Sequence, residues 1–232
     1  MMWLIYVVAL LFGLLVILPE IHMWLESVTR RFKRRGIAPP PKAVTVTSVI
    51  IYPMKSCAGV KVEESHPLTK RGLRFDRQWM VVDDAGNFVS QRSHPRMALI
   101  QPTLPTSERA PLRLSAPDMP PIEVPVVVAE GENRRTVTVW GDTCVGVDQG
   151  DAVAAWIAKF MNEPTLRVVR MDDDFVRITD PAFAKGFQTG FSDGYPLSMV
   201  SEESLADLNL RLPEGCEKLP MDRFRPNIVV KG

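Results

Sequence analysis

The stretch AVTVTSVIIYPMKSCAGVKVEES, residues 43–65, joins a β-branched run to a cluster of a lysine, a hydroxyl and a thiol. Near-alternation of apolar and polar residues predicts a β-strand, which the Tyr-Pro pair ends. Lys55 and Ser56 follow at the strand end, where side chains and the free amides of a turn can converge on one ligand. These groups suit phosphate or another anion, and the alternative is a surface turn with a solvated lysine.

The remainder of the chain predicts a mostly β fold with many turns, in keeping with its 20 prolines. Two helices are predicted, over residues 151–161 with Asp151 as N-cap and over residues 201–212 with Ser201 as N-cap. Further strands are predicted at residues 77–83, 88–91, 97–101, 112–116, 122–128, 134–140 and 224–232.

Composition narrows the classes of function. At 232 residues, 46% apolar and 24% charged, the chain is long enough and apolar enough for a real core. A net charge of +1 argues against a nucleic-acid partner. Cys57, Cys144 and Cys216 lack the CxxC spacing, which disfavours a disulfide framework or a structural zinc site and favours a reducing compartment.

The N-terminal segment has the composition of a membrane anchor. Residues 1–19 carry no charge, and as a helix they would extend roughly 28 Å, close to the hydrocarbon thickness of a bilayer. A cleaved signal peptide is disfavoured because no basic region precedes the run and no small-residue cleavage site follows it. We therefore expect one transmembrane helix within residues 1–25, then a basic, proline-rich linker over residues 26–43, with the body of the chain in the cytosol.

Two arginines extend the predicted anion site. Arg77 stands between Asp76 and an aromatic-rich strand in FDRQWMVVD, and Arg225 enters a strand in FRPNIVV, followed closely by Asn227. A planar guanidinium suits a phosphate or the edge of a heteroaromatic ring. The alternative for Arg77 is a structural ion pair with Asp76 or another acid.

Five blocks of sequence, in order, resemble the MOSC family of molybdenum cofactor proteins, and within it the mitochondrial amidoxime reducing components. The blocks are IYPMKSCAGVKVEES, GLRFDRQWMVVDDAGNFVSQRSHPRMALIQP, VWGDTCVGVDQGDAVAAWI, FSDGYPLSMVSEESLADLN and FRPNIVVKG. The resemblance implies an α+β, mostly β fold. It places a β-barrel-like N-terminal MOSC domain at residues 44–165 and an incomplete MOSC β-barrel at residues 166–232.

The same resemblance implies a site for the molybdenum cofactor, Mo-molybdopterin. Lys55 and Ser56 would hold its phosphate, Arg77, Arg225 and Asn227 would add contacts, and Gly194 and Tyr195 would contribute mainly backbone groups. No residue is assigned as catalytic or as a metal ligand. The implied activity is reduction of N-hydroxylated compounds such as amidoximes, with electrons from NADH through cytochrome b5 reductase and cytochrome b5, at the outer mitochondrial membrane.

Other readings remain open. In the family, the cysteine that binds molybdenum follows the FRPN strand at some distance, whereas this sequence continues for five residues after Asn227. We therefore expect a fragment of a longer reductase, or a cofactor-binding module without turnover. Cys57 would lie at the phosphate end of the pterin, far from the metal. A role in handling cofactor sulfur, with the pyridoxal phosphate binding of sulfurases, is a further alternative, which the absence of an aminotransferase-like domain disfavours.

Overall fold

The structure is a computed structural model that describes residues 43–63, 66–126 and 133–232. The chain forms two units, Met1–Val44 and Thr45–Gly232, and the second contains the elements described below. The expected anchor, residues 1–25, lies outside the described residues, as does the expected linker except for residue 43. Among the described residues, no helix combines the length and the apolar character needed to span a bilayer.

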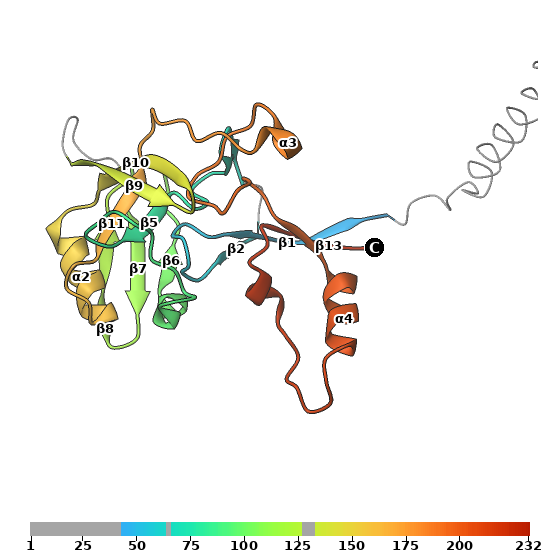
Figure 1. The fold of residues 1–232 in the computed structure, drawn as a ribbon. Coiled ribbons are helices and arrows are strands. Elements are labelled where there is room, and N and C mark those ends of the chain that lie inside the picture. The colour runs from blue at the N-terminus through green and yellow to red at the C-terminus, as the bar shows by residue number, and fades with distance from the viewer. Residues whose placement is uncertain (1–42, 64–65, 127–132) are drawn as a thin grey trace, which may run out of the picture. The chain divides into compact units, whose positions relative to one another are not determined.

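Short strands and few helices make up the second unit (Figure 1). In chain order, the elements are β1 (Thr45–Ile51), β2 (Val60–Val62), β3 (Leu68–Thr69), β4 (Gly72–Leu73), β5 (Trp79–Val82), η1 (Pro95–Leu99), β6 (Gln101–Thr103), β7 (Leu112–Ala116), β8 (Met119–Val124), β9 (Arg134–Val139), β10 (Asp142–Asp148), α2 (Asp151–Met161), β11 (Arg167–Met171), α3 (Pro181–Ala184), β12 (Met199–Ser201), α4 (Glu202–Leu210), η2 (Met221–Phe224) and β13 (Ile228–Lys231).

The first sheet joins the two ends of the unit. Its strand order is β12-β13-β1-β2, with β1 antiparallel to β13 and β2, and β12 parallel to β13. Val49 lies opposite both Ile228 and Val62 in the register. In Figure 1 the blue strand β1 and the red strand β13 accordingly lie side by side. This pairing brings the turn after β1 close to the residues that precede β13.

A second sheet, β5-β11-β10-β9, is antiparallel throughout and pairs Trp79 with Arg170. A three-stranded sheet, β6-β7-β8, and the two-stranded β3-β4 complete the described sheets. A barrel requires every strand to have two neighbours. Here β12 and β2 are the edges of one four-stranded sheet and β5 and β9 the edges of the other. The expected barrels are therefore wrong for the described residues, which form open sheets instead.

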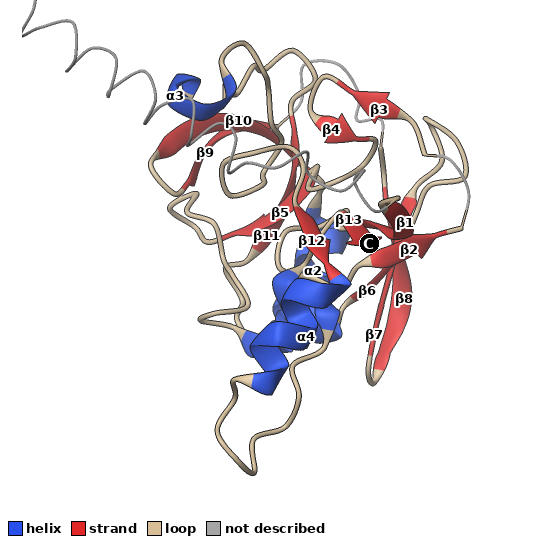
Figure 2. Cartoon of the chain, turned by 90° about the vertical axis from the view of Figure 1, so that its right-hand side faces the viewer, coloured by secondary structure: helices blue, strands red, loops and turns tan. Residues whose placement is uncertain are grey.

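The main core includes the buried face of α2 and residues of β1, β5, β7, β8 and β11. Figure 2 labels these elements. The helix predicted over residues 151–161 is confirmed, and its predicted apolar face, Val153, Trp156, Ile157 and Phe160, is buried. Its cap is corrected. Gly150 occupies the N-cap with φ of 87°, a conformation that favours glycine, and Asp151 is the first helical residue.

The second predicted helix, α4, ends two residues earlier than expected and buries none of its residues. Its predicted cap is confirmed, because Ser201 Oγ accepts a hydrogen bond from the Ser204 amide at 3.0 Å. The strand expected at residues 97–101 is wrong over its first part, where Pro95 begins the 3₁₀ helix η1. In the strand expected at residues 88–91, Phe88 forms an isolated bridge to Val82.

Candidate functional site

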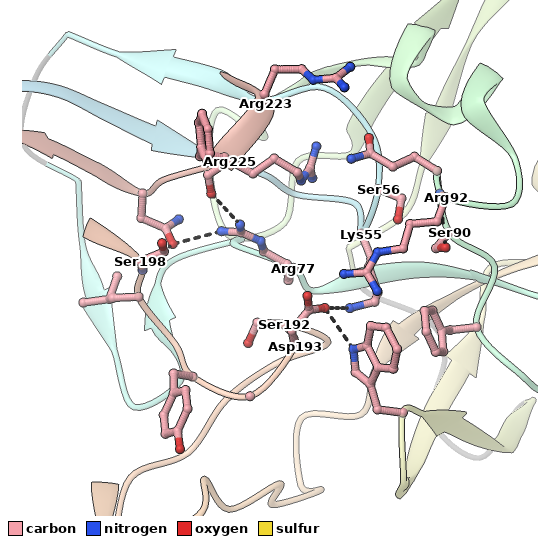
Figure 3. A pocket seen from close by; sticks show the side chains of 18 residues that line it. Lys55, Ser56, Arg77, Ser90, Arg92, Ser192, Asp193, Ser198, Arg223 and Arg225 are labelled. Carbon is pink, nitrogen blue, oxygen red and sulfur yellow. Dashed lines mark hydrogen bonds and ion pairs between the residues drawn. The ribbon is translucent and has the colours of Figure 1, made fainter. Parts of the chain in front are cut away.

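Loops from distant parts of the chain surround a cavity of about 500 Å³ (Figure 3). All seven residues that the sequence predicted for the cofactor line it: Lys55, Ser56, Arg77, Gly194, Tyr195, Arg225 and Asn227. The pairing of β1 with β13 accounts for much of this convergence, since it brings Lys55 near Arg225 across 170 residues of sequence. The cofactor role of the seven residues stays a prediction.

Lys55 is a buried cation, only 5% exposed. Its Nζ donates to Phe191 O at 2.9 Å and to Asp193 Oδ1 at 2.5 Å. Burial lowers the pKa of Lys55, and the hydrogen bond and charge of Asp193 oppose that effect. The Asp193 carboxylate also accepts from Trp140 Nε1 at 3.0 Å. Its own pKa, which burial would raise, is held below its ordinary value by Lys55.

Three of the seven residues adopt the left-handed backbone conformation that non-glycine residues avoid. Their φ angles are 69° at Ser56, 46° at Arg77 and 51° at Arg225. Each such residue costs about 1–2 kcal/mol, and strain of this kind collects at functional sites. All three of these residues belong to the set predicted to contact the cofactor.

Arg77 is held by a buried acid and a buried amide. Its Nη1 donates to Asp76 Oδ2 at 2.7 Å and to Asn227 Oδ1 at 2.9 Å. Asn227, 1% exposed, donates through Nδ2 to Asp76 Oδ1 at 2.9 Å and to Ile50 O at 3.1 Å. The structural pairing of Arg77 with Asp76, left open by the sequence, is therefore present. Arg77 and Asn227 both line the cavity, and the side-chain amide of Asn227 also positions Arg77.

Arg225 lies over the ring of Tyr52, with 4.2 Å from Cζ to the ring centre, and Arg77 lies over the same ring at 4.4 Å. Arg225 Nη1 also donates to Cys57 O at 2.6 Å. Burial, and then the charge of Arg77, lowers the pKa of Arg225. Two guanidinium groups are thus held close together at one wall of the cavity, where an anion would relieve their repulsion.

Sequence reasoning missed the residue that fixes the loop carrying Asp193. Arg177 is buried and donates to the carbonyl oxygens of Gly190 at 2.8 Å, Ser192 at 2.6 Å and Asp193 at 3.2 Å. It also pairs with Asp142 at 2.7 Å. An arginine within an otherwise aperiodic loop gives little local signal, because its partners are carbonyl groups defined by tertiary structure.

The sequence analysis also did not predict the aromatic wall of the cavity. Phe88 and Trp140 line it with ring centres 5.0 Å apart, and Arg92 lies 5.0 Å from the Trp140 ring. Lys55 Nζ lies 5.2 Å from the Phe88 ring. Exposed aromatic faces beside cations can stack a flat, electron-rich ring.

The charge of the cavity is strongly positive. Its lining includes Lys55, Arg77, Arg92, Arg223 and Arg225, and the carboxylate among its lining residues is that of Asp193. Five cations against one carboxylate define a site for an anion, and the aromatic wall suits a planar group attached to it. The described residues therefore fit the phosphate and ring system of a pterin cofactor.

The cysteines lie elsewhere. Cys57 and Cys144 are buried, Cys216 is exposed, and all three are absent from the cavity lining. Burial raises the pKa of Cys57 to about 12, which makes its thiol inert as a ligand or nucleophile. Within the described ranges, no group of three or more His, Cys, Asp or Glu side chains could hold a metal ion.

Comparison with known proteins defines the class. Residues 43–164 match the MOSC N-terminal beta barrel domain, and residues 187–232 match the MOSC domain. The chain belongs to the MOSC family, which confirms the resemblance read from the five sequence blocks. Neither matched domain is a pyridoxal phosphate domain, so the expectation of pyridoxal phosphate binding is unsupported.

Among curated proteins, the chain is 36% identical over 198 residues to mitochondrial amidoxime reducing component 2 of Rattus norvegicus. It is 36% identical over 197 residues to mitochondrial amidoxime-reducing component 1 of Homo sapiens. Each match covers 81% of this chain and 56% of the relative, so the chain spans about half the length of these proteins. Molybdenum cofactor sulfurase of Bos taurus is 32% identical over 209 residues, which is 23% of that protein.

Proposed function

We propose that the cavity binds the molybdenum cofactor and that the chain forms part of a reductase for N-hydroxylated compounds such as amidoximes. The observation that carries the proposal is the cluster of five cations around one carboxylate, beside an aromatic wall. The names of the relatives support the same chemistry. When bound, the cofactor would supply the two-electron redox chemistry of the reduction, for which the residues that line the cavity offer no redox-active side chain of their own.

The chain's own residues would bind and orient this group. Lys55 and Ser56 would contact the phosphate. Arg77, which precedes β5, and Arg225, which precedes β13, would compensate its charge. Phe88 and Trp140 would lie against the pterin ring. Because Arg77 is fixed by Asp76 and Asn227, its free donors are oriented before the ligand arrives.

The remaining parts of the proposal rest on the relatives alone. From the family resemblance we infer that electrons arrive from NADH through cytochrome b5 reductase and cytochrome b5. The word mitochondrial in the names of the relatives supports a mitochondrial location.

The proposal is tested by measuring bound pterin and reductase activity on the same preparation. The chain is expressed in a host that makes the cofactor, and released pterin is oxidised and quantified by fluorescence. Wild type should retain pterin. Lys55→Gln should retain at least about tenfold less, because a charge-assisted hydrogen bond to phosphate contributes roughly 1.5–3 kcal/mol. Lys218→Gln, at an exposed lysine outside the cavity, should match wild type.

Activity is assayed with an aryl amidoxime, NADH, cytochrome b5 and its reductase. Amidine formation that follows pterin content across the three proteins supports the reductase. Pterin without turnover assigns the chain as a cofactor-binding module instead. Wild type without pterin, or equal retention in Lys55→Gln, overturns the assignment of the cavity.

A further inference from the structure

A second, larger cavity lies next to the proposed cofactor site. It has a volume of about 800 Å³ and is formed by the end of β1, the start of β2, the 3₁₀ helix η1 and the segment around η2. The residues that line this cavity alone include Tyr52, Lys61, Pro95, Ala98, Pro220 and Asp222. The proposed function makes no use of this space.

The two cavities share one wall. Gln91, Arg92, Arg223 and Arg225 line both, so three guanidinium groups lie between them. In the view of Figure 3, Arg223 lies on the opposite side of Arg225 from Arg77. These three arginines therefore contribute positive charge to the second cavity as well as to the first.

The second cavity is itself electropositive. Its lining carries Lys61 and the three arginines against one carboxylate, Asp222. In the described part of the chain, neither Lys61 nor Arg223 forms an ion pair. Uncompensated cations that converge on one cavity favour an anionic ligand.

Apart from Gln91 and Gln101, the rest of the lining is largely apolar. Tyr52 is 2% exposed, and the guanidinium groups of Arg77 and Arg225 lie 4.4 Å and 4.2 Å from the centre of its ring. Pro95, Ala98 and Pro220 add apolar surface. Gly59 lets the turn approach the tyrosine closely, because a Cβ there would lie 2.6 Å from Tyr52 Cε1. The Tyr52 ring is therefore a fixed part of the wall.

We propose that this second cavity is a binding site for a small organic anion, a carboxylate or phosphate ester on a flat apolar body. The anionic group contacts Lys61 and Arg223, and the apolar body packs against the proline and alanine surface. The site can be tested separately from the cofactor site, since Lys61 and Ala98 line the second cavity and not the first.

The test uses ¹⁹F NMR titration of the purified chain with 4-fluorobenzoate and 4-fluorophenyl phosphate, and with neutral 4-fluorobenzamide as the control ligand. Both anions should bind in fast exchange, and the amide should not. Lys61→Gln should weaken the anions about three- to fivefold, as expected for a partly screened charge pair. Ala98→Phe should weaken binding of the anions, because the ring would cover the apolar surface on which the ligand packs, and because Ala98 is exposed its replacement leaves the core intact.

The Lys55→Gln variant distinguishes binding in the second cavity from binding in the first. Binding of the anions should persist in this variant, because Lys55 lines only the first cavity. Loss of binding in Lys55→Gln with no effect of Lys61→Gln and Ala98→Phe would overturn the proposal, as would equal binding of the neutral amide or no binding of either anion. Preference for one anion over the other identifies the ligand as a carboxylate or a phosphate ester.

Discussion

The left-handed residues at the cavity show how single positions combine strain with binding. Ser56, Arg77 and Arg225 all have positive φ, and each is tied to the rest of the molecule by burial or by hydrogen bonds. The cost of these conformations, about 1–2 kcal/mol each, is offset by the surrounding contacts. The surrounding contacts therefore keep these three residues in the left-handed conformation.

Ser56 provides a test in which stability and binding separate. Ser56→Gly should leave the free energy of unfolding unchanged or raise it by up to about 1 kcal/mol, because glycine adopts φ of 69° without strain. Pterin retention should fall, since the hydroxyl donor is removed. Denaturant unfolding and pterin fluorescence measure the two effects. A variant that is destabilised, or that retains pterin at the wild-type level, would contradict this account of Ser56.

Asp193 competes for the cation that the ligand needs. Its carboxylate is 67% exposed but pairs with the buried Nζ of Lys55, so it occupies a position suited to an incoming anion. Asp193→Asn should therefore raise pterin retention, by about threefold after allowance for solvent screening. Asp207→Asn, which breaks the exposed pair with Arg211, is the matched control. Loss of pterin in Asp193→Asn would mean that this carboxylate contacts the cofactor itself.

Local chemistry predicted part of this site. Lys55 and Ser56, which follow a strand, and Arg225, which stands before a proline at the start of another, could be recognised from residue types alone. Arg177, Trp140 and Asp193 could not, because their roles depend on partners 13 to 138 residues away. Likewise, the sequence left the pairing of Arg77 with Asp76 open, and the burial of Asp76 decides it.

Elements with a strong period were the most predictable. The helix at residues 151–161 has four large apolar residues on one face and was predicted with the observed bounds. The strand expected at residues 97–101 failed because Pro95 favours the first turn of a helix, which a short apolar run cannot signal. Pairing was beyond prediction, since nothing in β1 specifies that it should meet β13 rather than another strand.

Asp148, at the end of β10, ties three elements together. Its carboxylate pairs with Arg135 at 2.7 Å and with Arg167, and it accepts from the Gly150 amide at 2.9 Å, just before α2. Burial alone would raise the pKa of Asp148. The hydrogen bonds from Arg167 and Gly150, with the arginine charges, outweigh burial and hold it below 3.8.

A carboxyl group whose pKa is lowered by folding stabilises the protein above its unfolded pKa, and this stabilisation is lost as the pH falls through the folded pKa. Asp148→Asn should therefore be destabilised relative to wild type at neutral pH, and the difference should shrink as the pH falls below about 4. Denaturant unfolding across pH 2–7 measures both proteins. A difference that is constant over this range would contradict the ion-pair account.

At the scale of the whole unit, the cavity closes only when both ends of residues 45–232 have folded together. Asp76 accepts from the Tyr52 amide at 2.8 Å, from Arg77 and from Asn227, so one buried carboxylate links the end of β1 to the start of β13. The sequence indicated a mostly β fold, and the family resemblance implied a β-barrel-like domain and an incomplete barrel. The open sheets observed instead follow from strand pairing, which composition does not encode.

Removal of this carboxylate should therefore affect the entire unit. Asp76→Ala should lower the free energy of unfolding by about 3–5 kcal/mol, because it removes a buried carboxylate and leaves the largely buried side chain of Arg77, 12% exposed, without its ion-pair partner. Asp84→Ala, at an exposed carboxylate, is the control. Urea unfolding followed by tryptophan fluorescence measures both variants. An effect below about 1 kcal/mol would show that solvent replaces the Asp76 contacts.

We propose that the phosphate of the cofactor lies between the turn after β1 and the residues before β13. A crystal structure of the pterin-loaded protein would test this placement. We expect phosphate density within hydrogen-bonding distance of Lys55 Nζ and Ser56, facing Arg225, with the Lys55–Asp193 pair opened. A pterin bound elsewhere, or an intact Lys55–Asp193 pair beside bound cofactor, would contradict it.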